Sequence, residues 1–111
     1  MKKLWQRLGL LAVVVVGVPP VMAEGPGPVN IKLFQFQPGV TEVRAGTRVT
    51  WSNQDDIEHT VTSGTPEKSD NRFNARLSGK GEMFGFTFIE AGTYPYFCNR
   101  HQSMRGEVRV K

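Results

Sequence analysis

Three side chains that often bind metals lie within seven residues near the end of the chain. Cys98, His101 and Met104 form a C-x2-H-x2-M cluster. A thiolate, an imidazole and a thioether suit copper better than calcium or magnesium, which prefer oxygen ligands. Two histidines and one cysteine in a trigonal plane, with a weak axial methionine, are typical of electron-transfer copper sites. The cluster therefore predicts a copper site whose second histidine comes from elsewhere in the chain.

His59 is the histidine that remains, because the chain has two His and one Cys. Each of these residues has an ordinary alternative when taken alone: a single buried cysteine is often a small hydrophobic residue, and a methionine often fills a core. Their joint occurrence favours a metal site. Met83 is a second candidate for the axial ligand, and zinc would also fit two His and one Cys with an open fourth position.

Strand patterns follow one another along most of the chain after residue 28. We expect strands at residues 29–36, 40–43, 48–53, 82–88 and 93–97, and a last one around residues 108–110. The first changes phase before the Pro38-Gly39 turn, which suggests a bulge or a strand that changes faces. For residues 63–81 the sequence does not decide between a short helix, an extra strand and a loose loop. No sustained helical period interrupts these strands, so the pattern indicates an all-β, single-domain sandwich.

Residues 1–23 have the features of a secretory signal peptide. Lys2, Lys3 and Arg7 precede a short apolar run, and small residues precede Glu24. The run is shorter than the roughly 20 residues that span a bilayer. We therefore expect cleavage after residue 23, a mature domain of residues 24–111, a periplasmic or otherwise exported location, and no stable membrane insertion.

Removal of this segment changes the charge of the protein. The full chain has 14 basic and 10 acidic residues, for a net charge of +4. Three of the basic residues and none of the acidic ones lie before Glu24, which leaves a mature net charge of +1. This balance argues against nucleic-acid binding through a basic surface. With a single cysteine, the small mature domain has no internal disulfide, so a metal is the expected stabilising element.

Two segments together carry a family resemblance. Trp51-x-Asn53-x5-His59-Thr60-Val61, and the stretch from Gly92 through Cys98-x2-His101-x2-Met104 to Val110, resemble the small type 1 (blue) copper proteins of the cupredoxin family, with ligand-loop spacing most similar to that of amicyanins. The resemblance implies a Greek-key β-sandwich. It also implies that His59, Cys98 and His101 are equatorial ligands, that Met104 is axial, and that Asn53 ties the His59 loop to the Cys98 loop. Glu58 and Thr60 depart from the family's usual Pro and Asn.

The resemblance implies a one-electron carrier with one copper ion that cycles between Cu(I) and Cu(II). We expect a monomer that docks redox proteins transiently near an exposed His101 edge, with Arg100 and Arg105 favouring an acidic partner surface. An enzyme is not expected, because multicopper enzymes need more histidines, and a thiol hydrolase based on Cys98 and His101 lacks a domain that could form a pocket. The main alternative is a protein that stores, senses or delivers copper.

Overall fold

The computed structural model describes residues 25–111, and the predicted signal peptide, residues 1–23, lies outside them. The nine strands of the described part are β1 (Val29–Lys32), β2 (Gln35–Gln37), β3 (Val40–Val43), β4 (Thr47–Asn53), β5 (His59–Gly64), β6 (Ser69–Leu77), β7 (Met83–Phe88), β8 (Gly92–Phe97) and β9 (Arg105–Val110). No helix occurs between residues 25 and 111, and hence none there is long and apolar enough to cross a membrane.

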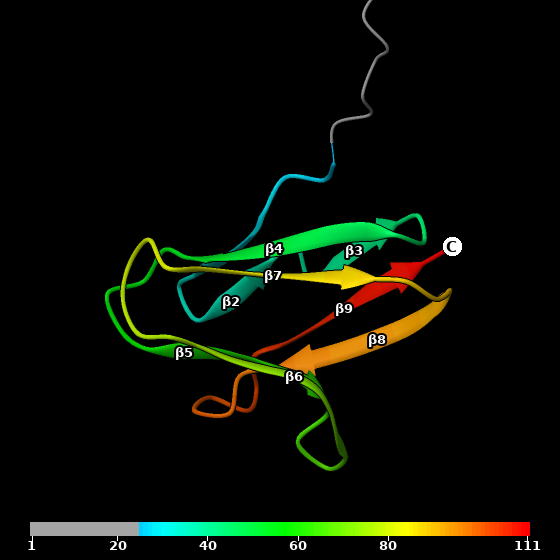
Figure 1. Cartoon of the computed structure of the whole chain (residues 1–111). Coiled ribbons are helices and arrows are strands. Elements are labelled where there is room, and N and C mark those ends of the chain that lie inside the picture. The colour runs from blue at the N-terminus through cyan, green and yellow to red at the C-terminus, as the bar shows by residue number, and fades with distance from the viewer. Residues whose placement is uncertain (1–24) are drawn as a thin grey trace, which may run out of the picture.

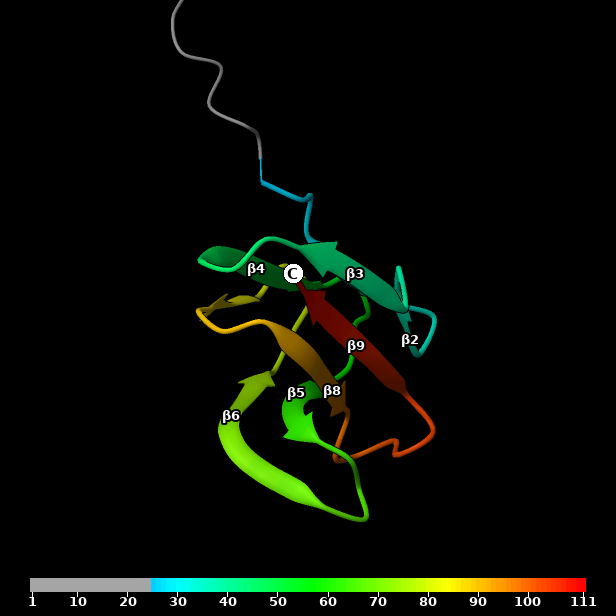
Figure 2. The same ribbon diagram turned by 90° about the vertical axis from the view of Figure 1, so that its right-hand side faces the viewer.

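The strands form two sheets that pack face to face (Figure 1). One sheet has the order β2-β1-β4-β7, and the other has the order β3-β9-β8-β5-β6. The chain crosses between the sheets, so β1 runs parallel to β4 and β3 runs parallel to β9, whereas the other pairs are antiparallel. Figure 2 shows β3 beside β9 at the edge of the second sheet. The predicted all-β sandwich is confirmed.

The core lies between the sheets because the strands alternate buried and exposed side chains. Val49 and Trp51 of β4 are fully buried, as the period of two predicts. Phe88 of β7 is buried as well, and Phe84 and Phe86 pack against the same cluster. Trp51 lies at the centre, with ring centroids 5.2 to 6.4 Å from those of its aromatic neighbours Phe73, Phe84, Phe88 and Tyr96.

The first predicted strand is in fact a hairpin. Residues 29–36 do not form one strand with a bulge; β1 and β2 pair antiparallel, with Lys32 opposite Gln35. The two turn residues, Leu33 and Phe34, have φ angles of 53° and 59°. Two-residue hairpins favour this left-handed conformation, but Asn and Gly normally supply it, so a Leu-Phe turn gives no sequence signal. The change of phase therefore marked a reversal of direction.

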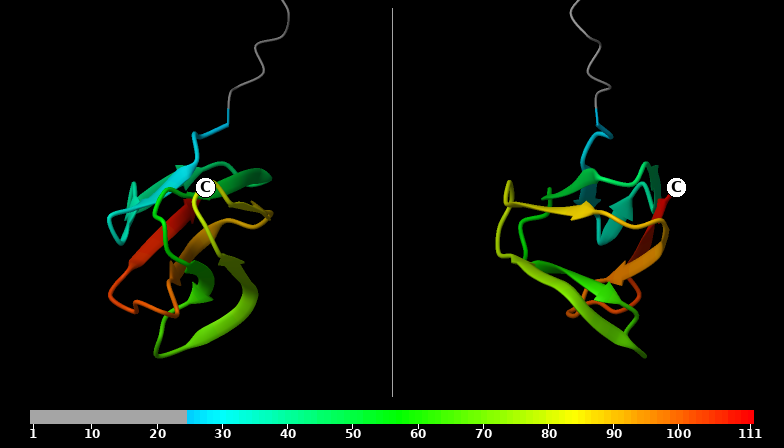
Figure 3. Two further views of the ribbon diagram at one scale, coloured as in Figure 1. Left: turned by 90° about the vertical axis from the view of Figure 1, so that its left-hand side faces the viewer. Right: turned by 45° about the vertical axis from the view of Figure 1, so that its right-hand side comes forward.

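The ambiguous segment, residues 63–81, contains an extra strand. β6 pairs with β5 along most of its length, and the register shifts between Thr62 and Gly64. Gly64 has a φ of 95°, and a Cβ there would lie 2.6 Å from the carbonyl oxygen of Lys68, so this tight reversal requires glycine. In the right-hand view of Figure 3, β5 and β6 lie side by side on the side of the sandwich away from the first sheet. β6 thereby extends the sheet that carries His59.

Candidate metal centre

Two segments far apart in the sequence bring the candidate ligands together. His59 is the first residue of β5, and Cys98 and His101 lie on the loop between β8 and β9. β5 pairs with β8 in the middle of the second sheet, with Thr62 opposite Phe97, and this register sets the start of β5 beside the end of β8. The loop lies at the end of the sandwich opposite the C-terminus, since β9 leads from one to the other (Figure 1).

The ligand loop consists of short hydrogen-bonded turns. The amide of His101 donates to the carbonyl of Cys98 at 3.3 Å, and the amide of Met104 donates to the carbonyl of His101 at 2.8 Å. The Cys98 amide closes the loop by donating to the carbonyl of Met104 at 3.1 Å. Each of these two turns joins an amide to the carbonyl three residues before it, which matches the interval between successive ligands in C-x2-H-x2-M. The backbone fixes where all three side chains begin.

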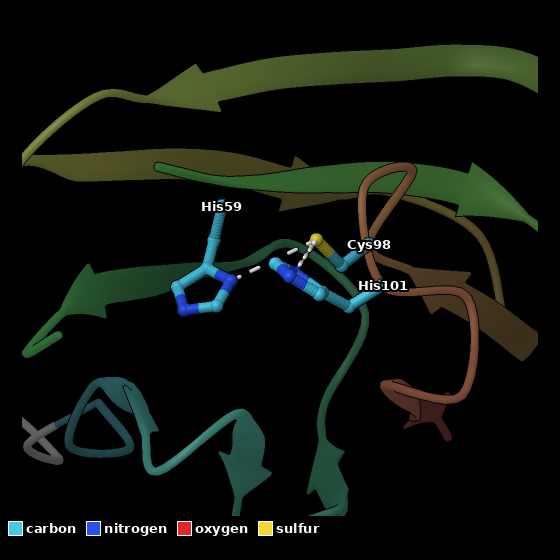
Figure 4. Close-up of side chains that lie close together, drawn as sticks. All are labelled: His59, Cys98 and His101. Carbon is cyan, nitrogen blue, oxygen red and sulfur yellow. Dashed lines mark hydrogen bonds between the residues drawn. The ribbon is translucent and has the colours of Figure 1, made fainter. Parts of the chain in front are cut away.

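The three predicted equatorial side chains converge on one point (Figure 4). Cys98 Sγ lies 3.8 Å from His59 Nδ1 and 4.0 Å from His101 Nδ1, and the three ligand atoms lie within 4.8 Å of one another. A metal bound at about 2.3 Å to sulfur and about 2.1 Å to nitrogen would separate such donors by about 3.8 Å in a trigonal plane. The spacing of the three atoms therefore fits a single metal ion, and the kinds of donor suit copper.

The two candidate axial residues have opposite environments. Met104 is 3% exposed and belongs to the same buried cluster as Cys98. Met83 is 57% exposed, because it alternates with the inward-facing Phe84 on β7. A buried thioether on the ligand loop suits an axial role, and an exposed thioether does not. The structure favours Met104, and its ligation stays a prediction.

Asn53 does not make the contact that the resemblance implied. Its side-chain amide donates to the carbonyls of Ile57 at 2.9 Å and Leu77 at 3.1 Å, and its side-chain oxygen accepts from the amide of Asp55 at 2.9 Å. Both donors and the acceptor are thus used within the loop before β5 and at the end of β6. Asn53 shapes the loop that carries His59, but it does not tie that loop to Cys98.

Thr60 makes the link between the ligand loops instead. Its backbone amide donates to Cys98 Sγ at 3.4 Å, and its hydroxyl oxygen accepts from the amide of Asn99 at 2.7 Å. The same hydroxyl lies 2.9 Å from that of Thr62, which donates to Asn74 Oδ1 and accepts from Asn99 Nδ2. The Thr60 hydroxyl therefore donates to Thr62. The residue noted above only as a departure from the family pattern is the one that joins the loops.

Asp55 and Phe34 also contact the site, and sequence analysis identified neither. Asp55 Oδ2 lies 2.8 Å from His59 Nε2. Burial raises the pKa of the Asp55 carboxyl, but hydrogen bonds from the amides of Phe34 and Leu33 and from His59 outweigh it, so the pKa lies below its ordinary value. The Phe34 ring meets His59 and His101 edge on, at centroid distances of 5.4 and 4.9 Å. Both residues reach the site through loops whose shape the sequence pattern does not predict.

A two-sheet β-sandwich with a largely buried His-Cys-His cluster at one end is the architecture of a small blue copper protein, a cupredoxin. The family model described as copper binding proteins, plastocyanin/azurin family, matches residues 27–111. The chain belongs to this plastocyanin/azurin family of copper binding proteins. The predicted resemblance and the predicted copper cofactor are confirmed.

Individual relatives agree with this family. The chain is 31% identical over 90 residues to the amicyanin of Paracoccus denitrificans, covering 81% of this chain and 69% of the relative. It is 35% identical over 80 residues to the amicyanin of Paracoccus versutus, covering 72% and 60%. The plastocyanin of Scenedesmus fuscus is 33% identical over 85 residues, covering 68% and 86%. The chain thus spans less than two thirds of the length of one of these amicyanins.

Solved structures show the same fold. A purple cupredoxin from Nitrosopumilus maritimus superposes with a TM-score of 0.66 at 32% identity, covering 72% of this chain and 85% of that one. The Cu(I) form of an amicyanin point mutant superposes with a TM-score of 0.63 at 33% identity, covering 82% and 87%. These superpositions each extend over more than two thirds of this chain.

Proposed function

We propose that the mature protein is an exported carrier of single electrons, with one copper ion held by His59, Cys98 and His101 and, axially, by Met104. The observation that carries the proposal is the convergence of the cysteine sulfur and two histidine Nδ1 atoms at one end of the sandwich. Copper bound there would supply a one-electron couple between Cu(I) and Cu(II). The protein would supply a ligand arrangement that resists change and a path for the electron to the surface.

The protein's first contribution is a site that resists rearrangement. Cys98 and His59 are fully buried, and the ends of β5 and β8 hold their backbones. The Thr60 amide fixes the Cys98 sulfur, and the Thr60 hydroxyl fixes the next residue of the ligand loop. Hydrogen bonds to a ligand sulfur tune the potential of such sites. Ligands tied in this way keep nearly one arrangement in both oxidation states.

The second contribution is a path to the surface. His59 is buried, whereas His101 is partly exposed, so the His101 edge is the proposed exit for the electron. Beside it lies one apolar side chain of the β1–β2 turn, since the Phe34 ring contacts the His101 ring and Phe34 is 49% exposed. We propose that redox partners dock there briefly, as a small apolar contact favours.

The charges near the loop give less support to an acidic partner than the sequence suggested. Arg100 lies 3.7 Å from the carboxylate of Glu58, which also pairs with Arg76 at 3.1 Å. Arg105 pairs with Glu67 through two hydrogen bonds of 3.0 and 3.4 Å, and this pairing lowers the pKa of the Glu67 carboxyl. Both arginines therefore have acidic partners within the chain. We propose that apolar contact dominates docking.

A nucleophilic role for Cys98 has no structural support. Its side chain is fully buried, and its sulfur accepts a hydrogen bond from Thr60 and faces two imidazoles. A thiol hydrolase needs its nucleophile open to substrate. We therefore propose a protein without catalysis, released from its signal peptide after residue 23 and acting outside the cytoplasm as a monomer.

Voltammetry of the copper-loaded protein tests this function. An electron carrier should give a reversible one-electron wave and rapid self-exchange between its Cu(I) and Cu(II) forms. A protein that stores or delivers copper should instead show slow electron self-exchange. It should also lose Cu(I) readily to a competing chelator. Irreversible voltammetry together with ready loss of Cu(I) would refute the proposed function and support the alternative.

A further inference from the structure

The turn between β1 and β2 lies over the metal centre in an uncommon conformation. Leu33 and Phe34 have φ angles of 53° and 59°, in the left-handed region that L residues with large side chains seldom adopt. Something outside the turn must hold this backbone. Leu33 does not do so by burial, because its side chain is 71% exposed.

The carboxylate of Asp55 holds the turn. Asp55 Oδ1 accepts the amide of Leu33 at 2.8 Å, and Asp55 Oδ2 accepts the amide of Phe34 at 3.1 Å. Two successive amides thus converge on one side chain that lies more than 20 residues further along the chain. Hydrogen bonds to a charged acceptor are stronger than neutral ones. The anchor therefore comes from the loop that leads into His59.

The same carboxylate also orients the His59 ring. Asp55 Oδ2 lies 2.8 Å from His59 Nε2. An ionised carboxylate only accepts hydrogen bonds, so Nε2 must carry the proton. The lone pair of the neutral ring is then on Nδ1, the atom that lies 3.8 Å from Cys98 Sγ. Asp55 selects the tautomer in which His59 can bind a metal through Nδ1.

The turn returns to the site through the Phe34 ring. This ring contacts both imidazoles edge on, at 86° to His101 and 88° to His59. The position of Phe34 depends on the turn, and the turn depends on Asp55. The Asp55 carboxylate thus contacts the His59 imidazole directly, and through the turn it holds the Phe34 ring that packs against both imidazoles.

We infer that Asp55 is a positioning residue of the metal centre, which couples the Leu33-Phe34 turn to the His59 imidazole. This inference rests on the proposed copper site for its effect on metal binding. Its structural part, the His59 tautomer and the anchored turn, can be measured without metal. An outer residue that orients a ligand histidine typically contributes 10- to 100-fold to metal affinity.

The experiment compares Asp55→Asn with Asp56→Asn. Asp56 is the adjacent, exposed carboxylate, and its substitution removes the same charge. An asparagine at position 55 has one oxygen, so it leaves at least one of the three N–H donors facing its NH2 group. Long-range 1H–15N spectra of the metal-free proteins report the His59 tautomer, and amide hydrogen exchange reports the turn. Titration with Cu(II) and EPR spectra report the site.

We expect the parent protein and Asp56→Asn to keep the His59 proton on Nε2 and to protect the Leu33 and Phe34 amides. In Asp55→Asn, we expect a mixed tautomer or at least about tenfold faster exchange of one turn amide. We also expect about 10- to 100-fold weaker Cu(II) binding, with a changed copper hyperfine coupling. If Asp55→Asn loses its folded near-UV CD signal, Asp55→Ser, which is smaller and carries a hydroxyl, replaces it in the same comparison.

The inference is overturned if a folded Asp55 variant matches Asp56→Asn in tautomer, exchange rates, copper affinity and EPR spectrum. Failure of the proposed function would look different. The parent protein itself would then lack a type 1 copper spectrum, while the metal-free measurements would still decide whether Asp55 holds His59 and the turn.

Discussion

The backbone amide of Thr60 donates a hydrogen bond to the sulfur of Cys98, across 38 positions of sequence and a distance of 3.4 Å. The Thr60 hydroxyl accepts the amide of Asn99, the residue after Cys98. One threonine thus holds the start of β5 against the ligand loop at two points. Its side-chain contact can be removed separately from its backbone contact.

Thr60→Val should weaken the link between the loops while it keeps the amide bond to Cys98. The valine has nearly the same shape, but it leaves the Asn99 amide without its acceptor, which costs about 1 kcal/mol of unfolding free energy. Thr60→Ser keeps the hydroxyl and serves as the matched control. Denaturant unfolding of the metal-free proteins measures the difference. Equal stability of the Val and Ser variants would show that the hydroxyl does not hold the loop.

Met104→Leu should leave the fold intact and alter the copper site. The two side chains have similar volumes, so the loss of stability should be below about 1.5 kcal/mol. Loss of a weak sulfur donor destabilises Cu(II) more than Cu(I), and the reduction potential should therefore rise. Voltammetry and the optical spectrum check this result. Met83→Leu, at the exposed position on β7, should change neither the reduction potential nor the spectrum. A larger change of potential in Met83→Leu than in Met104→Leu would indicate that Met83 is the axial ligand.

Gly106→Ala should destabilise the sandwich. Gly106 lies opposite Tyr96 in the β8–β9 pair, and a Cβ at position 106 would lie 2.5 Å from Tyr96 Cζ. The Tyr96 ring is buried and cannot retreat without disturbing its neighbours, so we expect a loss of about 1–3 kcal/mol in thermal or denaturant unfolding. At Gly79 the nearest atom would be Glu82 Oε2 at 3.9 Å, and Gly79→Ala should therefore have little effect. A similar loss at both positions would contradict this explanation.

Tyr96 should make the protein less stable in alkali. Burial raises its pKa from 10.0 to about 12 in the folded protein. Above pH 10 the unfolded chain releases this proton first, so stability falls as the pH rises from 10 towards 12, by about 1.4 kcal/mol per pH unit. Tyr96→Phe should remove this part of the fall, and Tyr94→Phe should retain it. Identical alkaline profiles of the two variants would exclude Tyr96 as the cause.

Much of the site could be predicted from the sequence because its residue types are rare. A single cysteine and two histidines leave few combinations, and the spacing from Cys98 to Met104 follows from two hydrogen-bonded turns. The core strands were predictable for a different reason. Alternation of apolar residues such as Val49 and Trp51 indicates which face of a strand is buried.

Other features depend on tertiary contacts that leave no pattern. The Leu33-Phe34 turn forms without Asn or Gly, and Asp55, distant in sequence, accepts hydrogen bonds from both of its amides. β6 carries few apolar residues because it lies at a sheet edge, with four exposed positions at its start. The roles of Asn53 and Thr60 could not be separated by residue type, since both are polar residues near the same loop. Their hydrogen-bond partners decide between them.

The spectrum of the Cu(II)-loaded protein tests the central claim most directly, that one thiolate and two imidazoles hold the copper. Optical and EPR spectra should be compared for the parent protein and the variants Cys98→Ser, His59→Ala and His101→Ala. We predict an intense thiolate-to-copper absorption in the visible range with the narrow hyperfine splitting of a type 1 site, lost in Cys98→Ser and altered in both histidine variants. A parent spectrum without the thiolate band, or an unchanged spectrum in Cys98→Ser, would contradict the account.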